Sequence, residues 1–401
     1  MIDWGDVVKK IRLRDVTDVI TKGTTPTSIG YEFVNKGINF IKVESITEDG
    51  AFIENKFAYI TDECNKKLSR SQLQENDILF SIAGAIGRVA IVDKNILPAN
   101  TNQALAIIRL HKGVYEYNFL KYILKSPAIS KQFEKQKQGV AQINLSLKNI
   151  GDFEIPVISI EQQKKIADEF DKVTVLIDKR KRQLEKFDGL VKSRFIEMFG
   201  TLNANEKGFD VIDIEKLCTL IKDGTHQTPT YTEDKQNGFK FLSSKDVMTQ
   251  KICWEDIKYI PAELHEKLYA TIQPKRNDIL MSKNGVNYGV AAVNDTDEVF
   301  DIYVSLALLR PKTDRVNPVY LRCAINNPDT KRQFDSSIKG IGVPNLHLGE
   351  IKKTKVLLPP ISKQNELADF IEQVDKSKIE IKQSLEKLEL LKKALMQKYF
   401  G

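Results

Sequence analysis

The sequence predicts an α+β fold in which two pseudo-symmetric globular domains are separated by two long antiparallel helices forming a coiled coil. Three observations predict it. The chain repeats itself once at an interval of 201 residues, the first part of each copy alternates short β-rich runs with turns, and the last part carries a heptad pattern. A single duplication also predicts two similar sites whose details can diverge while their geometry is kept.

The repeat extends over the whole chain, with one local slip near Tyr59, which meets Tyr259 one residue early. It predicts globular domains at residues 1–158 and 201–360, each followed by a long helix, at residues 159–200 and 361–401. The interval of 201 residues aligns Gly23-Thr24 with Gly224-Thr225, Asn76-Asp77-Ile78-Leu79 with Asn277-Asp278-Ile279-Leu280, Arg109 with Arg310, Asn144-Leu145 with Asn345-Leu346, and Phe199-Gly200 with Phe400-Gly401.

The composition is that of a folded protein with a modest basic excess. Of the 401 residues, 41% are hydrophobic and the formal net charge is +7, which favours a nucleic-acid partner only mildly. The four cysteines (Cys64, Cys218, Cys253 and Cys323) are scattered, as in a reduced cytosolic protein. No basic and then apolar leader opens the sequence and no apolar run approaches the roughly 20 residues that cross a bilayer, so we expect a cytoplasmic protein.

In each globular part, four short apolar runs separated by glycine-containing turns are typical of strands. A helix is expected to follow them, at residues 117–136 in the first copy and at residues 318–335 in the second. The predicted strands lie at residues 38–43, 77–82, 89–92 and 105–110, with counterparts at residues 239–243, 278–281, 290–293 and 306–309.

The last part of each copy is predicted to be one long helix. Ser159 and Gln162 have the spacing of a capping box, whereas the second helix follows two prolines and has only Ser362 as a cap candidate. Gly200 and Gly401 stand where a helix-ending glycine belongs.

Apolar residues in each helix fall at alternating spacings of four and three, which is a heptad seam. Arg180 and Arg194 interrupt the first seam, and Lys378 and Lys392 interrupt the second. Such a stripe could pack on its own domain, but its length of about five heptads in both copies favours a coiled coil between the two helices. The seam positions are Ile166, Phe170, Val173, Ile177, Leu184, Phe187 and Val191 in the first helix, and Leu367, Ile371, Val374, Ile381, Leu385, Leu388 and Leu395 in the second.

Chain order sets the direction of the helix pair. The first helix leaves the first globular domain and ends at the second, and the second helix starts from the second domain, so a packed pair is antiparallel. At a rise of about 1.5 Å per residue, a helix of about 38 residues is about 57 Å long. Two domains at the ends of such a helix would lie about the length of one turn of DNA or more apart.

Motifs for catalysis are missing from the sequence. It has no GxxxxGK[ST] phosphate loop, no Asn-Pro-Pro-Tyr motif of an adenine methyltransferase and no zinc spacing among its histidines. Residues 81–88 superficially suggest a phosphate loop, but their copy at residues 282–289 keeps only the first glycine in register, so a turn between strands explains both. We therefore expect no catalytic residues, no metal site and no enzymatic activity in the chain by itself.

Short motifs recur in the same order in both copies, although Tyr303-Val304 stands opposite Asn102-Gln103 in the second. Their order makes the chain resemble the specificity subunit of type I restriction-modification systems over essentially its whole length. The motifs are Gly23-Thr24-Thr25-Pro26, Asn76-Asp77-Ile78-Leu79-Phe80-Ser81, Gln142-Ile143-Asn144-Leu145-Ser146 and Glu161-Gln162-Gln163-Lys164-Lys165-Ile166-Ala167, with Asn345-Leu346-His347-Leu348 and Lys363-Gln364-Asn365-Glu366-Leu367-Ala368 in the second copy.

The resemblance implies a non-catalytic DNA reader. Each globular part would be a target-recognition domain for one half of a bipartite sequence, and the helices would act as a ruler for the spacer. Such subunits recruit two methyltransferase subunits, which use S-adenosylmethionine to methylate adenine N6, and motor-nuclease subunits, which use ATP and Mg2+. No cofactor is expected on this chain, and the exposed faces of its helices are the expected docking surface for the methyltransferase.

Polar and basic loop residues are the candidates for contact with double-stranded DNA. For each of them alone, solvated surface or turn capping is an open alternative, and Asn144 and Asn345 look more like turn formers shared by the two copies. The candidates are Lys22, Thr24, Thr25, Arg88, Gln142 and Asn144 in the first domain, and His226, Lys245, Lys283, Asn284, Asn287 and Asn345 in the second.

Two other interpretations stay open. A non-enzymatic adaptor would hold two protein-binding domains apart, and a self-sufficient nuclease or methyltransferase would act alone. A steep salt dependence of DNA affinity distinguishes a DNA reader from an adaptor. Turnover by the purified chain with S-adenosylmethionine or Mg2+ would establish the enzyme.

Overall fold

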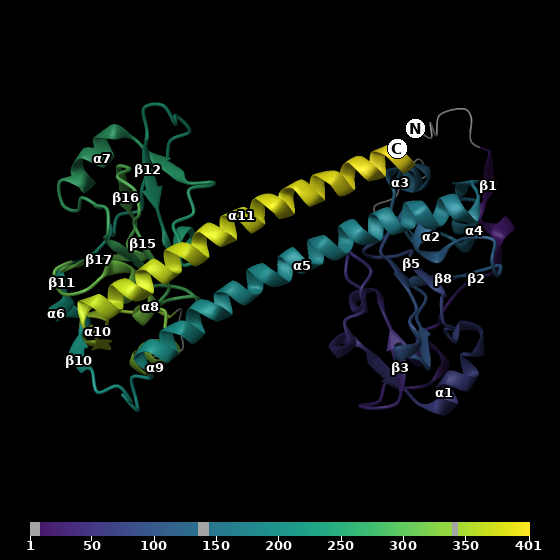
Figure 1. Cartoon of the computed structure of the whole chain (residues 1–401), viewed down its shortest axis with the longest axis horizontal. Helices are drawn as coiled ribbons and strands as arrows, with labels where there is room; N and C mark the ends of the chain where they lie inside the picture. The colour runs from purple at the N-terminus through teal and green to yellow at the C-terminus, as the bar shows by residue number, and fades with distance from the viewer. Residues whose placement is uncertain (1–8, 135–143, 339–343) are drawn as a thin grey trace. The chain divides into compact units, whose positions relative to one another are not determined.

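The computed structural model describes residues 9–134, 144–338 and 344–401, and the chain divides into two compact units. The first unit comprises residues 1–181 and 383–401, and the second comprises residues 182–382. Each unit therefore contains one globular part together with part of each long helix (Figure 1).

Among residues 9–134 and 144–199, the first globular part and the helix that follows it contain three sheets and five α-helices. β2 (Thr17–Lys22), β8 (Leu105–Leu110), β5 (Ile78–Ser81) and β6 (Val89–Ile91) form a four-stranded antiparallel sheet in that order. β4 (Ala58–Ile60), β3 (Ile38–Ile41) and β7 (Ala99–Thr101) form a second sheet, in which β3 and β7 are parallel, and β1 (Lys10–Arg12) pairs with β9 (Glu154–Pro156). The helices are α1 (Asp62–Lys67), α2 (Tyr117–Leu124), α3 (Pro127–Glu134), α4 (Leu147–Gly151) and α5 (Ile160–Phe199).

The four-stranded sheet is buried on both faces of its inner strands, which explains why β5 and β8 are almost wholly apolar in the sequence, with Arg109 as the one charged residue. Ile78 and Phe80 of β5 face the core that contains α2 and α3, whereas Leu79 faces a second core with Ile41 of β3. Successive side chains point to opposite faces of a strand. An unbroken apolar run is therefore expected where both faces are covered.

The second globular part has the same strand order in all three of its sheets. All eight predicted strands are present within two residues of their expected bounds, and the predicted α+β class with two like units is confirmed. The sheets are β11 (Cys218–Asp223), β17 (Leu306–Pro311), β14 (Ile279–Ser282) and β15 (Ala291–Val293); β13 (Lys258–Ile260), β12 (Phe239–Leu242) and β16 (Phe300–Ile302); and β10 (Asp210–Asp213) with β18 (Lys355–Leu358). The helices are α6 (Ile214–Leu217), α7 (Ala262–Tyr269), α8 (Pro318–Ile325), α9 (Pro328–Ser337), α10 (Leu348–Lys353) and α11 (Ile361–Phe400).

The single helix predicted near the end of each globular part is in fact two helices. α3 begins at Pro127 and α9 begins at Pro328, so the predictions of one helix over residues 117–136 and over residues 318–335 were wrong. Residues 135 and 136 lie outside the described residues. Proline cannot donate an N–H and disfavours helical backbone in the residue before it, so each proline starts a new helix.

The ends of α5 are those that the sequence predicts. The N–H of Gln162 donates to the Ser159 hydroxyl at 3.3 Å, and the N–H of Ser159 donates to Gln162 Oε1 at 3.3 Å, which completes the capping box. At the other end Gly200 takes a φ of 74° and its N–H donates to the carbonyl of Ile196 at 2.7 Å. A left-handed glycine ends the helix here.

α11 begins at Ile361, where the second long helix was expected, but without the expected cap. Ser362 is not a cap, because α11 already begins at Ile361. The carbonyl of Pro360 accepts from the N–H of Lys363 at 3.0 Å and from that of Gln364 at 3.2 Å. A proline with its fixed φ can precede a helix directly, so the helix starts two residues earlier than a cap at Ser362 would place it.

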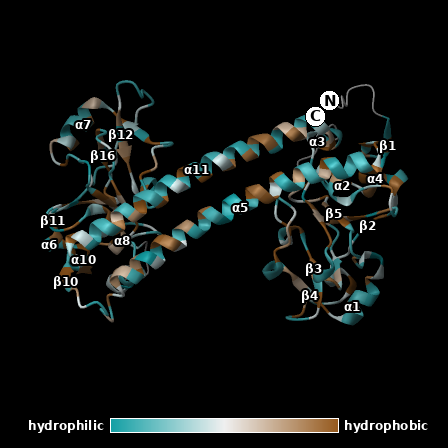
Figure 2. Ribbon diagram, in the orientation of Figure 1, coloured by the Kyte–Doolittle hydropathy of each residue, from teal (hydrophilic) through white to brown (hydrophobic). Residues whose placement is uncertain are grey.

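Contacts within each unit show that α5 and α11 pack together in antiparallel directions. In the first unit the Tyr399 hydroxyl donates to Glu169 at 2.9 Å, so the start of α5 meets the end of α11. In the second unit Arg194 lies 2.9 Å from Glu366, so the end of α5 meets the start of α11. All fourteen predicted seam residues named above are buried or half-buried, and Figure 2 shows apolar bands alternating with polar ones along both helices.

Two of the charged residues that interrupt the seam, Arg194 and Lys378, have partners on the opposite helix. Arg194 pairs with Glu366 and also lies over the ring of Phe370 at 5.8 Å. Lys378 Nζ lies 2.5 Å from Asp188. Exposed ion pairs contribute little stability, but these pairs allow a charged side chain to occupy the seam without being buried alone.

Each long helix ends in the core of a unit. Phe199, the last residue of α5, is fully buried in the second unit with its ring 4.9 Å from that of Tyr320. Phe400, the last residue of α11, is buried in the first unit between Phe119 and Phe170, with ring distances of 5.7 and 5.6 Å. The final residues of the chain therefore complete the core of the first unit.

Candidate nucleic-acid interface

In each unit, a loop leaves the edge strand of the four-stranded sheet through a glycine. A Cβ on Gly23 would lie 1.7 Å from the carbonyl oxygen of Thr101, and a Cβ on Gly224 would lie 2.2 Å from that of Ile302. Only glycine lets the backbone pass this close to β7 in the first unit and to β16 in the second, which are strands of the three-stranded sheets. The passage fixes where the loop begins in both units.

A second loop, between the last two strands of the same sheet, is anchored on a serine. The Ser81 hydroxyl donates to the carbonyl of Ala85 at 2.5 Å, and the Ser282 hydroxyl donates to that of Asn287 at 2.9 Å. Each hydroxyl also accepts an N–H from the returning chain. These bonds hold the hairpin loop in one shape.

A third segment lies against that hairpin loop. The N–H of Leu145 donates to the carbonyl of Ile82 at 3.0 Å, and the N–H of Leu346 donates to that of Lys283 at 2.9 Å. The loop cluster of each unit is defined here as these three segments: residues 22–26, 81–88 and 144–146 in the first unit, and residues 223–227, 282–290 and 344–346 in the second. Sheet topology thus brings together loops that lie far apart in the sequence.

The two loop clusters differ in charge at matching positions. In the second unit Lys283 Nζ lies 2.6 Å from Asp223, which is also 3.5 Å from the imidazole of His226. Lys283 is only 4% exposed, and a buried ammonium group needs a nearby opposite charge, which Asp223 supplies. Lys22 and Ile82 occupy the corresponding positions in the first unit, and that cluster has a half-buried lysine where the second has an aspartate.

In the second unit, the structure brings most of the predicted contact residues together. His226, Lys283, Asn284 and Asn345 all belong to the loop cluster, where Asn284 and Asn345 form an isolated β-bridge. Asn287 is exposed on the hairpin loop. Lys245 lies outside the three segments, and its ammonium group donates to the carbonyl of Asp256 at 3.1 Å.

In the first unit, the predicted residues have more varied surroundings. Lys22, Thr24 and Thr25 lie at the start of the first loop, where the Thr25 hydroxyl donates to Gln103 Oε1 at 2.5 Å, and Asn144 is exposed. The Arg88 guanidinium donates to the carbonyls of Val43 and Ile46 at 3.1 and 2.7 Å, so it ties the hairpin loop to another loop. Gln142 lies outside the described residues.

Sequence reasoning missed three residues of this region: Gln103, Asp223 and Val286. Gln103 stands in a recognised motif, but its bond to Thr25 spans 78 positions. Asp223 carries no local signal, because its partner Lys283 is distant in the sequence. Val286 is an apolar residue within a turn, which a pattern of strands and loops does not single out.

Beside the second loop cluster lies a buried pair that also differs between the units. His265 Nδ1 is 2.6 Å from Asp301 Oδ2, and burial raises the pKa of Asp301 while His265 partly opposes that rise. The first unit has Asn65 and Asn100 in the equivalent place, with Asn100 Nδ2 donating to Asn65 Oδ1 at 2.8 Å. The same internal bond is therefore neutral in one unit and titratable in the other.

A group of lysines lies where α2 packs near α11 in the first unit. Lys125 Nζ donates to the carbonyl of Glu48 at 2.6 Å. Burial, followed by the nearby charge of Lys392, lowers the pKa of Lys125 to about 8. Burial likewise lowers the pKa of Lys121, although Asp171 opposes this shift. These lysines belong to the packing of the helices and lie outside the loop cluster.

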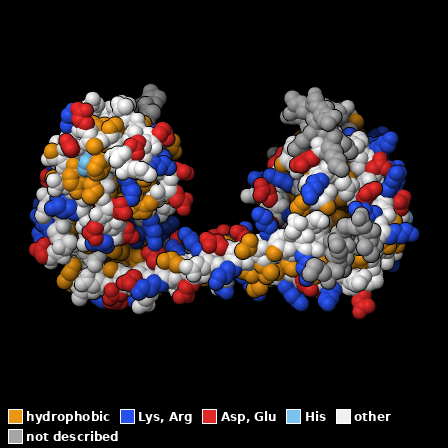
Figure 3. Space-filling view, turned by 90° about the horizontal axis from the view of Figure 1, so that it is seen from above, with side chains coloured by type: hydrophobic (Ala, Val, Ile, Leu, Met, Phe, Trp, Pro, Cys, Tyr) orange, Lys and Arg blue, Asp and Glu red, His pale blue; other side chains and the backbone are white. Residues whose placement is uncertain are grey.

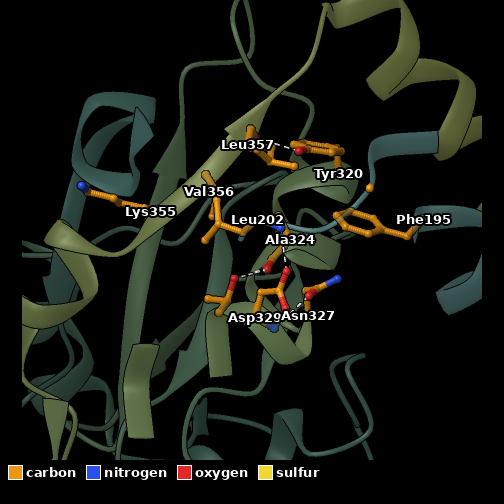
Figure 4. A pocket seen from close by; sticks show the side chains of 11 residues that line it. Phe195, Leu202, Tyr320, Ala324, Asn327, Asp329, Lys355, Val356 and Leu357 are labelled. Carbon is orange, nitrogen blue, oxygen red and sulfur yellow. Dashed lines mark hydrogen bonds between the residues drawn. The ribbon is translucent and has the colours of Figure 1, made fainter. Parts of the chain in front are cut away.

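A small pocket in the second unit marks the place where α5 docks (Figure 4). Its lining includes Phe195 from α5, Tyr320 and Ala324 from α8, and Val356 from β18. The carboxylate of Asp329 accepts the backbone N–H of Leu202 at 2.6 Å just beyond the helix. The mainly apolar lining and this backbone hydrogen bond indicate that the pocket is a packing gap between the end of α5 and the globular part of the second unit.

Among residues 9–134, 144–338 and 344–401, no group of three or more His, Cys, Asp or Glu side chains is arranged to hold a metal ion. No helix in the same described ranges combines the length and the apolar character needed to cross a membrane.

A family model describes most of this chain. The model for the type I restriction modification DNA specificity domain matches twice, at residues 6–186 and 206–392. The MjaVIII type I restriction enzyme specificity subunit of Methanocaldococcus jannaschii is 25% identical over 410 residues, which cover 98% of this chain and 91% of that protein.

Solved structures with the same fold cover the chain from end to end. The type I restriction-modification S subunit from M. genitalium superposes with a TM-score of 0.57 and 16% identity, over 100% of this chain and 98% of that one. A chain from a study of complex assembly and conformational transition of the type I restriction-modification system superposes with a TM-score of 0.61 and 17% identity, over 98% and 97%. These likenesses establish the fold.

Proposed function

This chain belongs to the family of type I restriction-modification DNA specificity subunits, and from that membership we propose that each of its units reads one half of a bipartite DNA target. The target-recognition domains would be residues 1–158 and 201–360. The helices at residues 159–200 and 361–401 would act as a ruler that sets the unspecified spacer between the two halves.

One observation carries the proposal: the two units share a backbone topology but present different side chains in the same loop cluster. Lys22 and Ile82 in the first unit correspond to Asp223 and Lys283 in the second. Contacts to phosphate position a protein on DNA, whereas side chains at base edges select the sequence. A shared frame with different side chains is suited to two unlike half-sites.

Within the loop clusters, the exposed polar residues are the contacts that we propose. Asn144 in the first unit, and His226 and Asn287 in the second, have the accessibility that contact with a base edge requires. Lys22, Thr24, Thr25, Asn284 and Asn345 would act beside them. Arg88 and Lys283 are engaged with other parts of the protein, and we assign them the role of holding the loops in place.

The long helices also carry apolar side chains outside the seam. Val175, Leu176, Leu190, Leu390 and Leu391 are exposed, and Figure 3 shows hydrophobic side chains gathered on the helix surface. Leu190 and Leu391 are equivalent in the two copies. We propose that these faces dock two methyltransferase subunits, and through them the motor-nuclease subunits, because an exposed apolar patch favours a protein partner.

The chemistry of modification and cleavage would then belong to those partners. We propose that this chain is not catalytic by itself and binds none of the cofactors directly. S-adenosylmethionine would bind to the methyltransferase subunits, and ATP and Mg2+ would bind to the motor-nuclease subunits. The complex would act on DNA in the cytoplasm.

Exchange of one globular domain tests the proposal. Residues 1–158 are replaced by the same domain of another family member, and the chain is expressed with its methyltransferase partner. We expect one half of the methylated motif to change while the other half and the spacer stay the same, as long-read detection of modified adenines in the cells would reveal. Methylation that lacks a bipartite motif, or a change in both halves, would contradict the proposal.

Shortening both helices tests the ruler. Removal of residues 180–186 and 381–387, which are equivalent in the two copies, deletes one heptad from each seam and keeps its register. A heptad is about 10 Å of helix, so the spacer should shorten by about three base pairs at about 3.4 Å per pair while both half-sites are kept. Deletion from α5 alone is the control and should abolish methylation, because the two helices would no longer match in length.

A further inference from the structure

The hairpin loop of the second unit carries an unusually exposed apolar side chain. Val286 is 87% exposed, more than any other large hydrophobic residue in the part of the chain that the structure describes. Single exposed apolar residues are common on protein surfaces. Val286 lies at the tip of a loop in the proposed DNA-reading cluster, so the partner expected there is DNA.

The loop that holds Val286 is anchored on both sides. The N–H of Gly285 donates to the carbonyl of Pro344 at 3.1 Å, and the Ser282 hydroxyl donates to the carbonyl of Asn287 at 2.9 Å. Lys331 Nζ lies 3.7 Å from the ring centroid of Tyr288, whose hydroxyl bonds to Asp335. These contacts hold the tip away from the unit's own core.

The tip is also a point of difference between the units. Phe80 pairs with Val89 in the first unit, but its counterpart Met281 pairs with Ala291, so the second hairpin loop is one residue longer. Ala85 stands at the position of Val286 in the alignment of the copies. A longer loop with a larger apolar tip reaches further from the sheet.

The chemistry of the loop fits the major groove of DNA. Residues 282–290 contain no acidic side chain, so the loop can approach phosphates without charge repulsion. Exposed Asn287 lies next to Val286, and an asparagine amide can bond to adenine while an apolar side chain packs on the C5-methyl group of thymine. Valine is also stiff at χ1, so its methyl groups present a defined surface.

We propose that Val286 is a specificity-determining residue, which contacts the C5-methyl group of a thymine in the half-site read by the second unit. The proposal rests on the function proposed above and adds to it one residue and one chemical group on the base. Asn287 would bond to the edge of the same or the adjacent base pair. The first unit, whose hairpin loop is one residue shorter, lacks this contact.

The test combines a protein change with a change of one methyl group on the DNA. The chain is assembled with its methyltransferase, and each thymine of the second half-site is replaced in turn by deoxyuridine, which lacks the C5-methyl group. With the unaltered protein, one replacement should weaken binding about fourfold, the change that corresponds to burial of a methyl group at about 0.8 kcal/mol. Val286→Ala should weaken binding to the thymine-containing DNA by a similar factor. The affinity of this variant should not change further when the same thymine is replaced by deoxyuridine, because a double-mutant cycle then shows that the two groups contact each other.

Each other outcome overturns the inference. If Val286→Ala stays sensitive to the same deoxyuridine, or if no thymine of the second half-site matters, Val286 does not contact a thymine methyl group. If Val286→Ala weakens assembly with the methyltransferase equally on both DNAs, the tip binds the protein partner. Failure of the function proposed above is distinguishable, because the unaltered chain would then direct no bipartite methylation at all.

Two controls accompany the test. Val286→Ala should leave deoxyuridine effects in the first half-site unchanged, and Ala85→Gly should leave those in the second half-site unchanged. Because Val286 is exposed, its replacement should leave the midpoint of urea unfolding of the chain unchanged. A lower midpoint would assign Val286 to the structure of the loop, and this too would overturn the inference.

Discussion

Phe400→Ala is expected to destabilise the first unit by about 3–5 kcal/mol, although Phe400 is the penultimate residue of the chain. Its ring is 4% exposed and packs 5.7 Å from Phe119 and 5.6 Å from Phe170. Removing the ring leaves a cavity in the core shared by α2, α5 and α11. The measurement is urea unfolding of the full chain, with hydrogen exchange followed separately in peptides of each unit.

Two variants serve as controls for this prediction. Phe199→Ala removes the equivalent ring in the second unit, where Phe199 packs on Tyr320, and should lower protection there by a similar amount. Leu390→Ala changes a side chain of α11 that is 68% exposed and should cost no more than about 0.5 kcal/mol. Loss of protection in the second unit alone after Phe400→Ala would show that the end of α11 does not complete the first core.

Arg109→Ala should cost about 3–5 kcal/mol in the first unit, because it leaves the buried carboxylate of Asp77 without its cation. Asp77 is 1% exposed, and both its oxygens accept from the Arg109 guanidinium at 2.7 Å. The expected loss lies toward the lower end of the range, since a quarter of the Arg109 side chain is exposed. The measurement is again urea unfolding of the full chain, with hydrogen exchange followed separately in peptides of each unit.

The duplication supplies a matched control for the ion pair. Arg310 binds Asp278 in the same way, with contacts of 2.8 and 2.7 Å, so Arg310→Ala should destabilise the second unit instead. The double variant Asp77→Asn/Arg109→Met should cost less than Arg109→Ala, because no buried charge is left alone. If the double variant were the less stable of the two, the stranded carboxylate would not explain the loss.

Supporting contacts that repeat in both units explain how the two copies keep the same backbone arrangement while their loops differ in side chains. The ion pair joins the residue before β5 to the end of its neighbour β8 in the first unit, and the residue before β14 to the end of β17 in the second. It lies at the end of these strands that is opposite the hairpin loop. The glycines at the loop starts and the serines at the hairpins repeat in the same way. With the backbone held by these residues, the longer hairpin loop that carries Val286 alters the surface while the strand order of the sheet is kept.

Much of the architecture was predictable from local pattern and repetition. Strands such as residues 105–110 are apolar except for Arg109 because both faces of the sheet are buried, and that property is visible in the sequence. The capping box of Ser159 and Gln162 acts over a single turn, so it too could be recognised. Pro127 and Pro328 were local signals of the same kind, but a single helix was predicted across them because the apolar periodicity continues on both sides.

The candidate interface was predictable only in part. The turns that hold Asn284 and Asn287 are evident from their composition. The pairing of Asp223 with Lys283 is not evident, because it joins residues 60 positions apart that meet only when β11 and β14 lie in one sheet with β17 between them. The same holds for the exposure of Val286, which depends on how the whole loop is anchored.

By itself, the amino-acid sequence determined the duplication, the strand and helix types and the antiparallel order of the long helices, because these follow from periodicity, capping and chain connectivity over short distances. Only the tertiary structure decided that Phe400 completes the first core, that Arg88 and Lys283 are occupied within the protein and that Val286 stands out from it. The physical reason is that these properties belong to contacts between distant segments. Whether a side chain holds a loop in place or is free to contact DNA depends on the neighbours that the folded chain places beside it.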